Sequence, residues 1–232
     1  MTVFNYDRFF HQNYFSFYSY EKLKDLVNDE DAIKAHLKNI EIPVINDPRD
    51  PLGELKIELS NILLVFGNQM IIHHCTVLDS MVENFFFSIF ASKPEIMKTF
   101  FATGEMKDRL GFSFNGFLES ESKEEYMQHL AKRAANVCAE GGPKKFFKRL
   151  RQITRSEFVE VDMEILNDLY NTLNSIIHDN LLYQIDIERM NEYTNTLQEV
   201  LFELHEVLTK MNIETKNSYL FNDLLRSGPD DS

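Results

Sequence analysis

Apolar residues recur at most helical positions between residues 55 and 92. Their spacings of three and four are typical of an α-helix, and together they cover most of its circumference, which predicts a long central helix. Lys93-Pro94 ends this helix, because the residue before a proline avoids the helical conformation, and a second helix is expected from Pro94 to about Phe101. The apolar positions of the long helix are Ile57, Ile62, Leu64, Val65, Ile71, Ile72, Leu78, Met81, Val82, Phe85, Phe86 and Ile89.

Five more helices follow from periodicity and from residues that favour helix starts. Pro143 is suited to the first position of a helix, and Asp162 and Asp186 are suited to the N-cap position. The expected helices cover about residues 20–37, about 123–138, 143 to about 154, a segment after Asp162 that contains residues 174 and 178, and a segment from Asp186 to about 211.

Prolines and glycines mark the expected breaks between helices. Three prolines and a glycine forbid continuous helix at 42–53, and three glycines among phenylalanines make 104–121 an irregular linker. We therefore expect an all-α protein with a helical bundle at residues 55–215. Residues 1–54 are expected to form an aromatic-rich N-terminal extension with a short helix and a Pro-rich loop. Residues 216–232 are expected to form a tail that is disordered from Ser227.

Composition indicates a globular protein with a substantial core, since 44% of the residues are hydrophobic and 12% are aromatic. Cys75 and Cys138 are too few for a disulfide framework, and the first eight residues lack the basic and apolar regions of a secretory leader. No uninterrupted apolar run reaches the roughly 18 residues that a membrane span needs. These observations favour a cytoplasmic protein with no membrane association, and no pattern indicates a cofactor.

The net charge of −13 argues against nucleic-acid binding by the whole surface, but one segment is basic. Residues 122–155 contain nine Lys or Arg and three acids, a local charge of +6. Four of these cations recur at i, i+4, i+7 and i+11, which places them on one helix face. Such a face can follow a phosphate backbone, or it can be a solvated face that balances nearby acids. The RNA-binding candidates are Lys144, Lys148, Arg151 and Arg155 of this face and the neighbouring Arg149.

A second polar feature lies on the helix after Asp162, where Asn174 and His178 are four residues apart. This spacing puts both side chains on one helix face, at the border of an apolar stripe, and Asp179 follows directly. The group indicates a polar site. The alternative is a histidine at a helix C-terminus, where the helix dipole favours its protonation.

Two further groups on the long helix contain residue types that occur in functional sites. His73-His74-Cys75 contains metal-binding residue types, but adjacent helical residues point about 100° apart and no second ligand pair is present, so we expect packing and no metal. Asp79 and Glu83 are four residues apart and could form a carboxylate pair or a hydrated helix side. Glu83 could also reach the basic helix or His178.

Two aromatic and apolar surfaces leave alternatives open. The Phe- and Tyr-rich residues 4–20 have no clean period and could recognise a partner or pack onto the bundle. On the last long helix, an apolar stripe could bury within one protomer or between two copies of the chain. Its members are Met190, Tyr193, Leu197, Val200, Leu204, Val207 and Met211.

The order of these helices resembles that of the HEPN superfamily over about residues 57–211, roughly two thirds of the chain. The long helix contains Val77-Leu-Asp-Ser-Met-Val-Glu-Asn-Phe-Phe86, with an acidic residue before aromatic positions, and the basic helix and the Asn174/His178 helix follow. The family signature is an arginine and a histidine separated by four to six residues, often as Arg-Asn-x-x-x-His. The stretch Leu173-Asn-Ser-Ile-Ile-His178 matches its Asn and His.

The resemblance implies a HEPN-like up-and-down helical bundle and, in active members, metal-independent RNA cleavage by a homodimer of a toxin or phage-defence type. It implies that His178 acts as general acid and base and that Asn174 and Asp179 orient it, while the basic face holds RNA. An antitoxin or regulatory protein is then the expected protein partner.

The chain departs from the family at Leu173, which stands where the family has arginine. Leucine cannot contact phosphate, so this role would fall to Arg149, Arg151 or Arg155, to Arg189, or to no residue. Two functions therefore stay open: a HEPN-type endoribonuclease, and a catalytically degenerate module that binds RNA or a protein partner as a scaffold.

Overall fold

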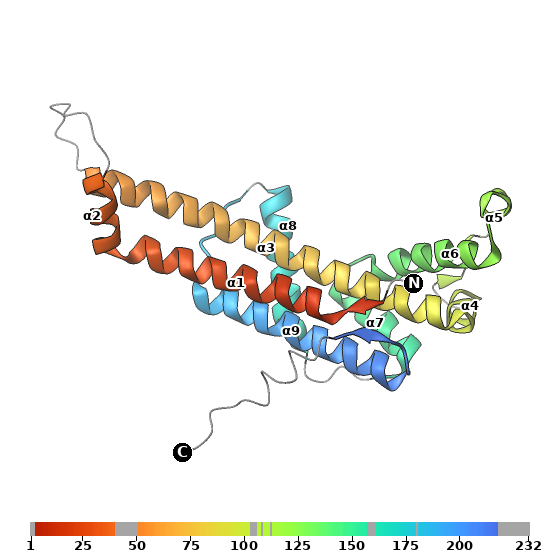
Figure 1. Ribbon diagram of the computed structural model, residues 1–232. Helices are drawn as coiled ribbons and strands as arrows, with labels where there is room; N and C mark the ends of the chain where they lie inside the picture. The colour runs from red at the N-terminus through yellow and green to blue at the C-terminus, as the bar shows by residue number, and fades with distance from the viewer. Residues whose placement is uncertain are drawn as a thin grey trace, which may run out of the picture.

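The computed structural model describes residues 3–39, 51–102, 106–107, 109–111, 113–156, 161–179 and 181–217. Within these ranges the chain forms a bundle of nine helices with one pair of short strands (Figure 1). The helices are α1 (Tyr6–Asn28), α2 (Glu30–Asn39), α3 (Pro51–Ser92), α4 (Pro94–Ala102), α5 (Phe114–Glu119), α6 (Lys123–Ala139), α7 (Pro143–Thr154), α8 (Met163–His178) and α9 (Ile187–Lys210). The strands are β1 (Phe4–Asn5) and β2 (Thr215–Lys216).

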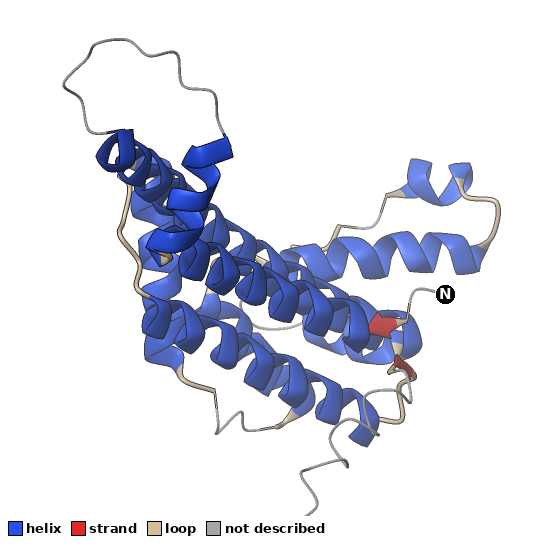
Figure 2. Ribbon diagram, turned by 60° about the vertical axis from the view of Figure 1, so that its left-hand side comes forward, coloured by secondary structure: helices blue, strands red, loops and turns tan. Residues whose placement is uncertain are grey.

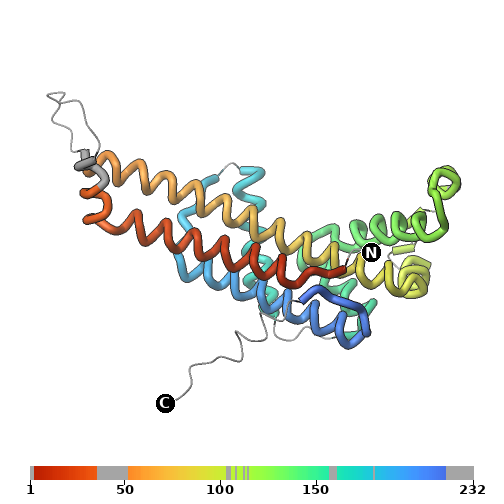
Figure 3. The backbone as a smooth tube through the Cα atoms, in the orientation of Figure 1, coloured from red at the N-terminus to blue at the C-terminus, as the bar shows by residue number. Residues whose placement is uncertain are grey.

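The predicted long central helix is α3, whose 42 residues run the length of the molecule. Its C-terminal half is buried against other helices, with Leu78, Phe86 and Phe90 fully inaccessible to solvent. Figure 3 shows α1, α3 and α9 running alongside one another. Among the described helices, α3 alone is long and apolar enough to span a membrane by length and composition. Its buried half forms the centre of the protein core.

The residues predicted to start helices do so. The Asp162 carboxylate accepts hydrogen bonds from the backbone N–H groups of Glu164 (2.8 Å) and Ile165 (3.2 Å) at the start of α8. The Asp186 carboxylate accepts from the backbone N–H of Arg189 (2.6 Å) at the start of α9. Each cap satisfies donors that the first helical turn leaves without partners. These predictions are confirmed, as is Pro143 at the first position of α7.

The prediction that residues 4 to about 20 lack a regular element is wrong. They belong to α1, a single helix that continues to Asn28. Aromatic residues occur on several sides of α1, which hides the helical period in the sequence. Phe9 and Tyr20 are buried in the core, while Phe15 is 55% exposed. The N-terminal segment therefore packs as part of the bundle, against α3 and α9.

Two other expectations are met only in part. The region expected to be an irregular linker at 104–121 contains the short helix α5. The loop expected at 42–53 gives way to α3 at Pro51, and the rest of that loop lies outside the described residues, as does the predicted disordered tail from Ser227.

The short strands were not predicted. Phe4 pairs with Thr215 and Asn5 with Lys216 in a parallel arrangement. Figure 2 shows the pair beside the start of α1. This pairing joins the beginning of α1 to the segment that follows α9.

Candidate functional site

The basic residues of α7 lie on two sides of the helix. The buried side comprises Phe146, Phe147 and Leu150, which are at most 2% exposed. The exposed side carries Lys144, Lys148 and Arg151, and the exposed Arg155 follows the helix as its C-cap in the left-handed conformation. We define these four residues as the cationic face. The first three members line a cleft of about 420 Å³ together with Phe147, Gln152 and Met163.

Arg149 is not part of the cationic face, which corrects its inclusion among the RNA-binding candidates. Its side chain is 4% exposed and points into the turn between α6 and α7. There the guanidinium donates hydrogen bonds to the backbone carbonyls of Cys138 (2.9 Å), Val137 (3.2 Å) and Glu140. Arg149 therefore closes the C-terminus of α6, where helical carbonyls lack partners.

Asn174, His178 and Asp179 are all exposed at the C-terminal end of α8. The backbone N–H of Asp179 donates to the carbonyl of Ser175 (3.1 Å) and ends the helix. Within the described part of the chain, no residue hydrogen-bonds or ion-pairs with the side chains of Asn174 or His178. A single copy of the chain thus presents His178 to solvent. Leu173, at the position of the family arginine, packs partly buried against the core.

Arg189 and Arg151, two of the residues that could replace the family arginine, do not lie beside His178. Arg189 donates to Asp168 from Nη2 (2.6 Å) and from Nε (3.1 Å), and pairs with Glu192 (2.5 Å). Arg151 shares its cleft with Met163, the first residue of α8. His178 is the last, and 15 residues at about 1.5 Å each put the two ends about 22 Å apart. The cationic face of α7 therefore lies near the N-terminal end of α8, whereas His178 lies at its C-terminal end.

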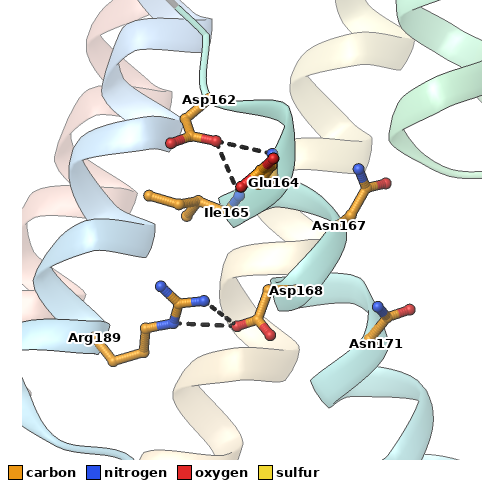
Figure 4. A pocket seen from close by; sticks show the side chains of 7 residues that line it. All are labelled: Asp162, Glu164, Ile165, Asn167, Asp168, Asn171 and Arg189. Carbon is orange, nitrogen blue, oxygen red and sulfur yellow. Dashed lines mark hydrogen bonds and ion pairs between the residues drawn. The ribbon is translucent and has the colours of Figure 1, made fainter.

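A polar pocket of about 640 Å³ lies between α8 and the start of α9 (Figure 4). Within it, Asp168 accepts hydrogen bonds from Arg189 and from the Tyr193 hydroxyl. Burial would raise the pKa of Asp168, but these hydrogen bonds outweigh burial and leave the pKa below its usual value. The pairing joins residues 21 apart and was not predicted. The pocket is lined by Asp162, Glu164, Ile165, Asn167, Asp168, Asn171 and Arg189.

Asp79 and Glu83 do not act as a pair. Asp79 accepts a hydrogen bond from the hydroxyl of Tyr170 on α8, and Glu83 forms an ion pair with Lys132 on α6. Burial, together with the Asp79 carboxylate, raises the pKa of Tyr170. The two carboxylates thus tie α3 to two different neighbours, and Glu83 contacts neither the basic helix nor His178 among the described residues.

The packing interpretation of His73-His74-Cys75 is supported for its two buried members. His74 is fully buried, with Nδ1 2.7 Å from the Met70 carbonyl and Nε2 3.1 Å from the Thr194 hydroxyl. Cys75 is 2% exposed, and burial raises the pKa of its thiol. Nowhere in the described ranges do three or more His, Cys, Asp or Glu residues come together as a metal site.

An apolar rim of three exposed side chains lies at and just after the C-terminal end of α8, and the sequence patterns did not predict it. We define this rim as Ile177, Leu181 and Leu182, which are 56%, 49% and 58% exposed. The segment after α8 is nevertheless held firmly, because the buried Asn68 of α3 donates to the carbonyl of Tyr183 (2.9 Å) and accepts from its N–H (3.0 Å). The rim is therefore an apolar surface on a fixed backbone.

Comparison of the chain with protein-family models, with curated proteins and with solved structures finds no match.

Proposed function

We propose that this protein binds RNA through the cationic face of α7. The observation that carries the proposal is the arrangement of Lys144, Lys148 and Arg151 along one exposed helix side, where they line a common cleft. Cations spaced along a helix can contact successive phosphates, and release of counterions then favours binding. The rest of the chain is acidic, since the total charge is −13, so this face is where a polyanion would be attracted.

We propose further that the cationic face belongs to a HEPN-like fold. A mostly helical bundle with a central apolar helix, a basic helix and a helix ending in His178 is consistent with that resemblance. In this setting the chain is a module that binds RNA without cleaving it, because Leu173 packs on the core, and no hydrogen bond or ion pair joins a described cation to His178.

The test is the salt dependence of binding to a labelled single-stranded RNA of mixed sequence, measured by fluorescence anisotropy. Four phosphate contacts predict a slope of about −3 for the logarithm of the association constant against the logarithm of salt concentration. Replacing both Lys148 and Arg151 with Gln should reduce the slope to about −1.5.

The matched control replaces Lys98 and Lys210 with Gln, since both are exposed lysines on other helices. This variant should bind RNA as the wild type does. An affinity that is insensitive to salt, or equal losses in the two double variants, would argue against binding at the cationic face.

A second candidate function, metal-independent RNA cleavage by a homodimer, is favoured by the apolar rim beside His178. A second copy covering this rim would bring two His178 side chains close together and could supply the missing cation. His178 would then exchange protons with the ribose 2′-hydroxyl and the leaving oxygen, while Asn174 and Asp179 orient it.

Cleavage is tested by incubating the protein with mixed RNA, with and without a chelator, beside His178→Ala. The nuclease hypothesis expects chelator-resistant cleavage by the wild type that His178→Ala abolishes. Intact RNA under all conditions would contradict the nuclease hypothesis and leave RNA binding as the proposed function. Cleavage that survives His178→Ala would show that another residue carries out the cleavage.

A further inference from the structure

A cleft of about 790 Å³ lies between α1, α3 and the connector that joins α8 to α9. Its volume falls within the roughly 300 to 1,000 Å³ that small-molecule sites occupy in proteins. The cleft shares no lining residue with the cleft beside the cationic face or with the polar pocket around Asp168. It is therefore a separate candidate site, which neither proposed function uses.

Hydrogen bonds and close packing fix the inner end of this cleft. The Tyr20 hydroxyl donates to the Ile185 carbonyl (2.9 Å), which joins α1 to the connector. A Cβ at Gly67 would lie 3.3 Å from the same hydroxyl, so the glycine lets Tyr20 lie close against α3. Asn68 bonds both backbone groups of Tyr183 and so joins α3 to the connector. The protein itself thus holds all three walls in place.

The cleft follows α1 and α3, which run antiparallel to each other (Figure 3). Its lining residues on α1 fall within positions 20–28, and those on α3 fall within positions 60–67. At a rise of about 1.5 Å per residue, these spans give a length of about 10 to 12 Å. An extended ligand therefore fits the cleft better than a round one.

Branched aliphatic side chains come from all three walls. Val27 lies on α1, Leu63 and Leu64 lie on α3, and Leu182 lies on the connector. Leu182 is 58% exposed, so much of its apolar surface faces water. A hydrocarbon chain in the cleft would remove that surface from water, which favours binding.

One charged side chain of the cleft is without a partner. No hydrogen bond or ion pair joins the Lys24 ammonium to a residue that the structure describes. The carboxylate of Asp186 is already engaged, because it accepts from the backbone N–H of Arg189 (2.6 Å). The side-chain amides of Asn61 and Gln184 add further donors from the other two walls. The polar groups therefore favour an anionic head group.

We propose that this cleft binds a small aliphatic carboxylate. The carboxylate contacts the Lys24 ammonium, and the hydrocarbon chain lies against Leu63, Leu64 and Leu182. The total charge of −13 repels anions from most of the molecule, so a local ammonium is needed to select a charged head group. The proposal is independent of RNA binding.

The test is equilibrium dialysis of the full-length chain against radiolabelled decanoate below its micellar concentration. We expect one saturable site per chain. Unlabelled decanoate should displace the label better than decanol, which has the same hydrocarbon chain without the charge. Absence of saturable binding, or equal displacement by the acid and the alcohol, would overturn the proposal.

Two lysine variants test the head-group contact. Lys24→Met should weaken decanoate binding about fivefold, the effect of losing a partly exposed ion pair. Lys22→Met is the matched control, because residues two apart on a helix point about 200° apart and Lys22 pairs with Asp25 (3.6 Å) outside the cleft. It should bind decanoate as the wild type does. Equal losses in the two variants would show a general effect of charge and contradict the role of Lys24.

Two leucine variants test the location. Leu182→Asp places a carboxylate in the cleft and should abolish saturable binding. Leu181→Asp changes the neighbouring exposed leucine, which does not line the cleft, and should leave binding intact. Both leucines belong to the apolar rim, so altered contact between copies would affect both variants alike. Equal binding by the two variants, whether kept or lost, would place decanoate outside the cleft and overturn the proposal.

Discussion

At the scale of single residues, burial and two polar contacts constrain the protonation of His74. A carbonyl can only accept, so the Met70 contact requires a proton on Nδ1. The Thr194 hydroxyl lies 3.1 Å from Nε2 and 2.9 Å from the Met190 carbonyl, and its single proton serves these two acceptors. Burial lowers the pKa of His74 to about 4, with a smaller opposing effect from the Met70 carbonyl. The fold therefore holds a neutral imidazole between α3 and α9.

We predict that His74 makes stability fall as the solution is acidified. The pKa is lowered in the folded state, so the unfolded chain binds a proton first, and stability is lost between the unfolded pKa of about 6.5 and the folded value of about 4. The loss is about 3 kcal/mol if the shift is fully expressed. His74→Gln keeps a donor and an acceptor but does not titrate, so urea unfolding at pH 7.5 and 4.5 should show a smaller difference in this variant. An unchanged difference would contradict the prediction.

Arg149 and Lys148 are neighbours with opposite expected roles. Removing the Arg149 guanidinium leaves three carbonyls at the end of α6 without their donor, so Arg149→Met should lower the free energy of unfolding by about 2 to 4 kcal/mol. RNA affinity of the folded variant should stay near the wild-type value. Lys148→Met should leave the free energy of unfolding near the wild-type value and weaken RNA binding. Denaturant unfolding measures the stability of each variant, and RNA titration measures its affinity. Equal stability of the two variants would count against the helix-closing role.

At the scale of elements, the connector between α8 and α9 depends on two side chains from other helices. Asn68 bonds both backbone groups of Tyr183, and the Tyr20 hydroxyl donates to the Ile185 carbonyl (2.9 Å). Gly67 allows this approach, because a Cβ there would lie 3.3 Å from the Tyr20 hydroxyl. The backbone after His178 is thus positioned from α1 and α3.

Asn68→Ala should therefore loosen the connector without unfolding the bundle. The Tyr183 amide loses its acceptor, and its hydrogen exchange should speed up on the order of tenfold, the effect of losing a bond of about 1.4 kcal/mol. Asn61→Ala is the control, since Asn61 is an exposed residue of the same helix beside the same segment. Similar exchange rates in the two variants would mean that Asn68 does not hold Tyr183.

The helices that the sequence predicts well are those with local signals at their ends. Asp162 and Asp186 act within three residues of their own positions, and Pro143 acts at its own, so the information is short-range. The β1 and β2 pairing joins residues from opposite ends of the chain through two residues each, and no local pattern encodes it. For α1, aromatic residues on several helix sides obscured the period.

The candidate residues show the same limit. Spacing alone places Lys144, Lys148 and Arg151 together, because i, i+4 and i+7 fall on one side of a helix. It does not place Arg155, which follows the end of α7 as its left-handed C-cap. Arg149 lies next to Leu150 and three residues after Phe146, so its buried side could have been read from the same wheel. The carbonyl groups that Arg149 contacts could not be predicted from the sequence, because they belong to α6 and to the turn after it, and their positions depend on how that turn folds. The surroundings of His178 likewise depend on packing that the motif does not specify.

At the scale of the whole molecule, the apolar rim beside His178 bears on the number of copies in solution. Three large, exposed apolar side chains within residues 177–182, on a backbone that Asn68 holds, are suited to contact between copies. We predict a dimer by solution mass that Ile177→Glu converts to a monomer. Leu118→Glu, on the more exposed Leu118 of α5, should leave the dimer intact. A monomeric wild type would rule out the dimeric arrangement that the cleavage hypothesis requires.

The strand pair has a consequence for the order in which the molecule assembles. Phe4 and Thr215 are separated by 211 residues, and closing a loop of that length in an unfolded chain costs about 5 kcal/mol. Two residue pairs cannot repay that cost alone, so the strands can pair only after α1 and α9 have already come together. The joining of the chain ends is then a late event in folding, and its loss an early one in unfolding, so hydrogen exchange at β1 and β2 would report partial opening while the centre of α3 remains closed.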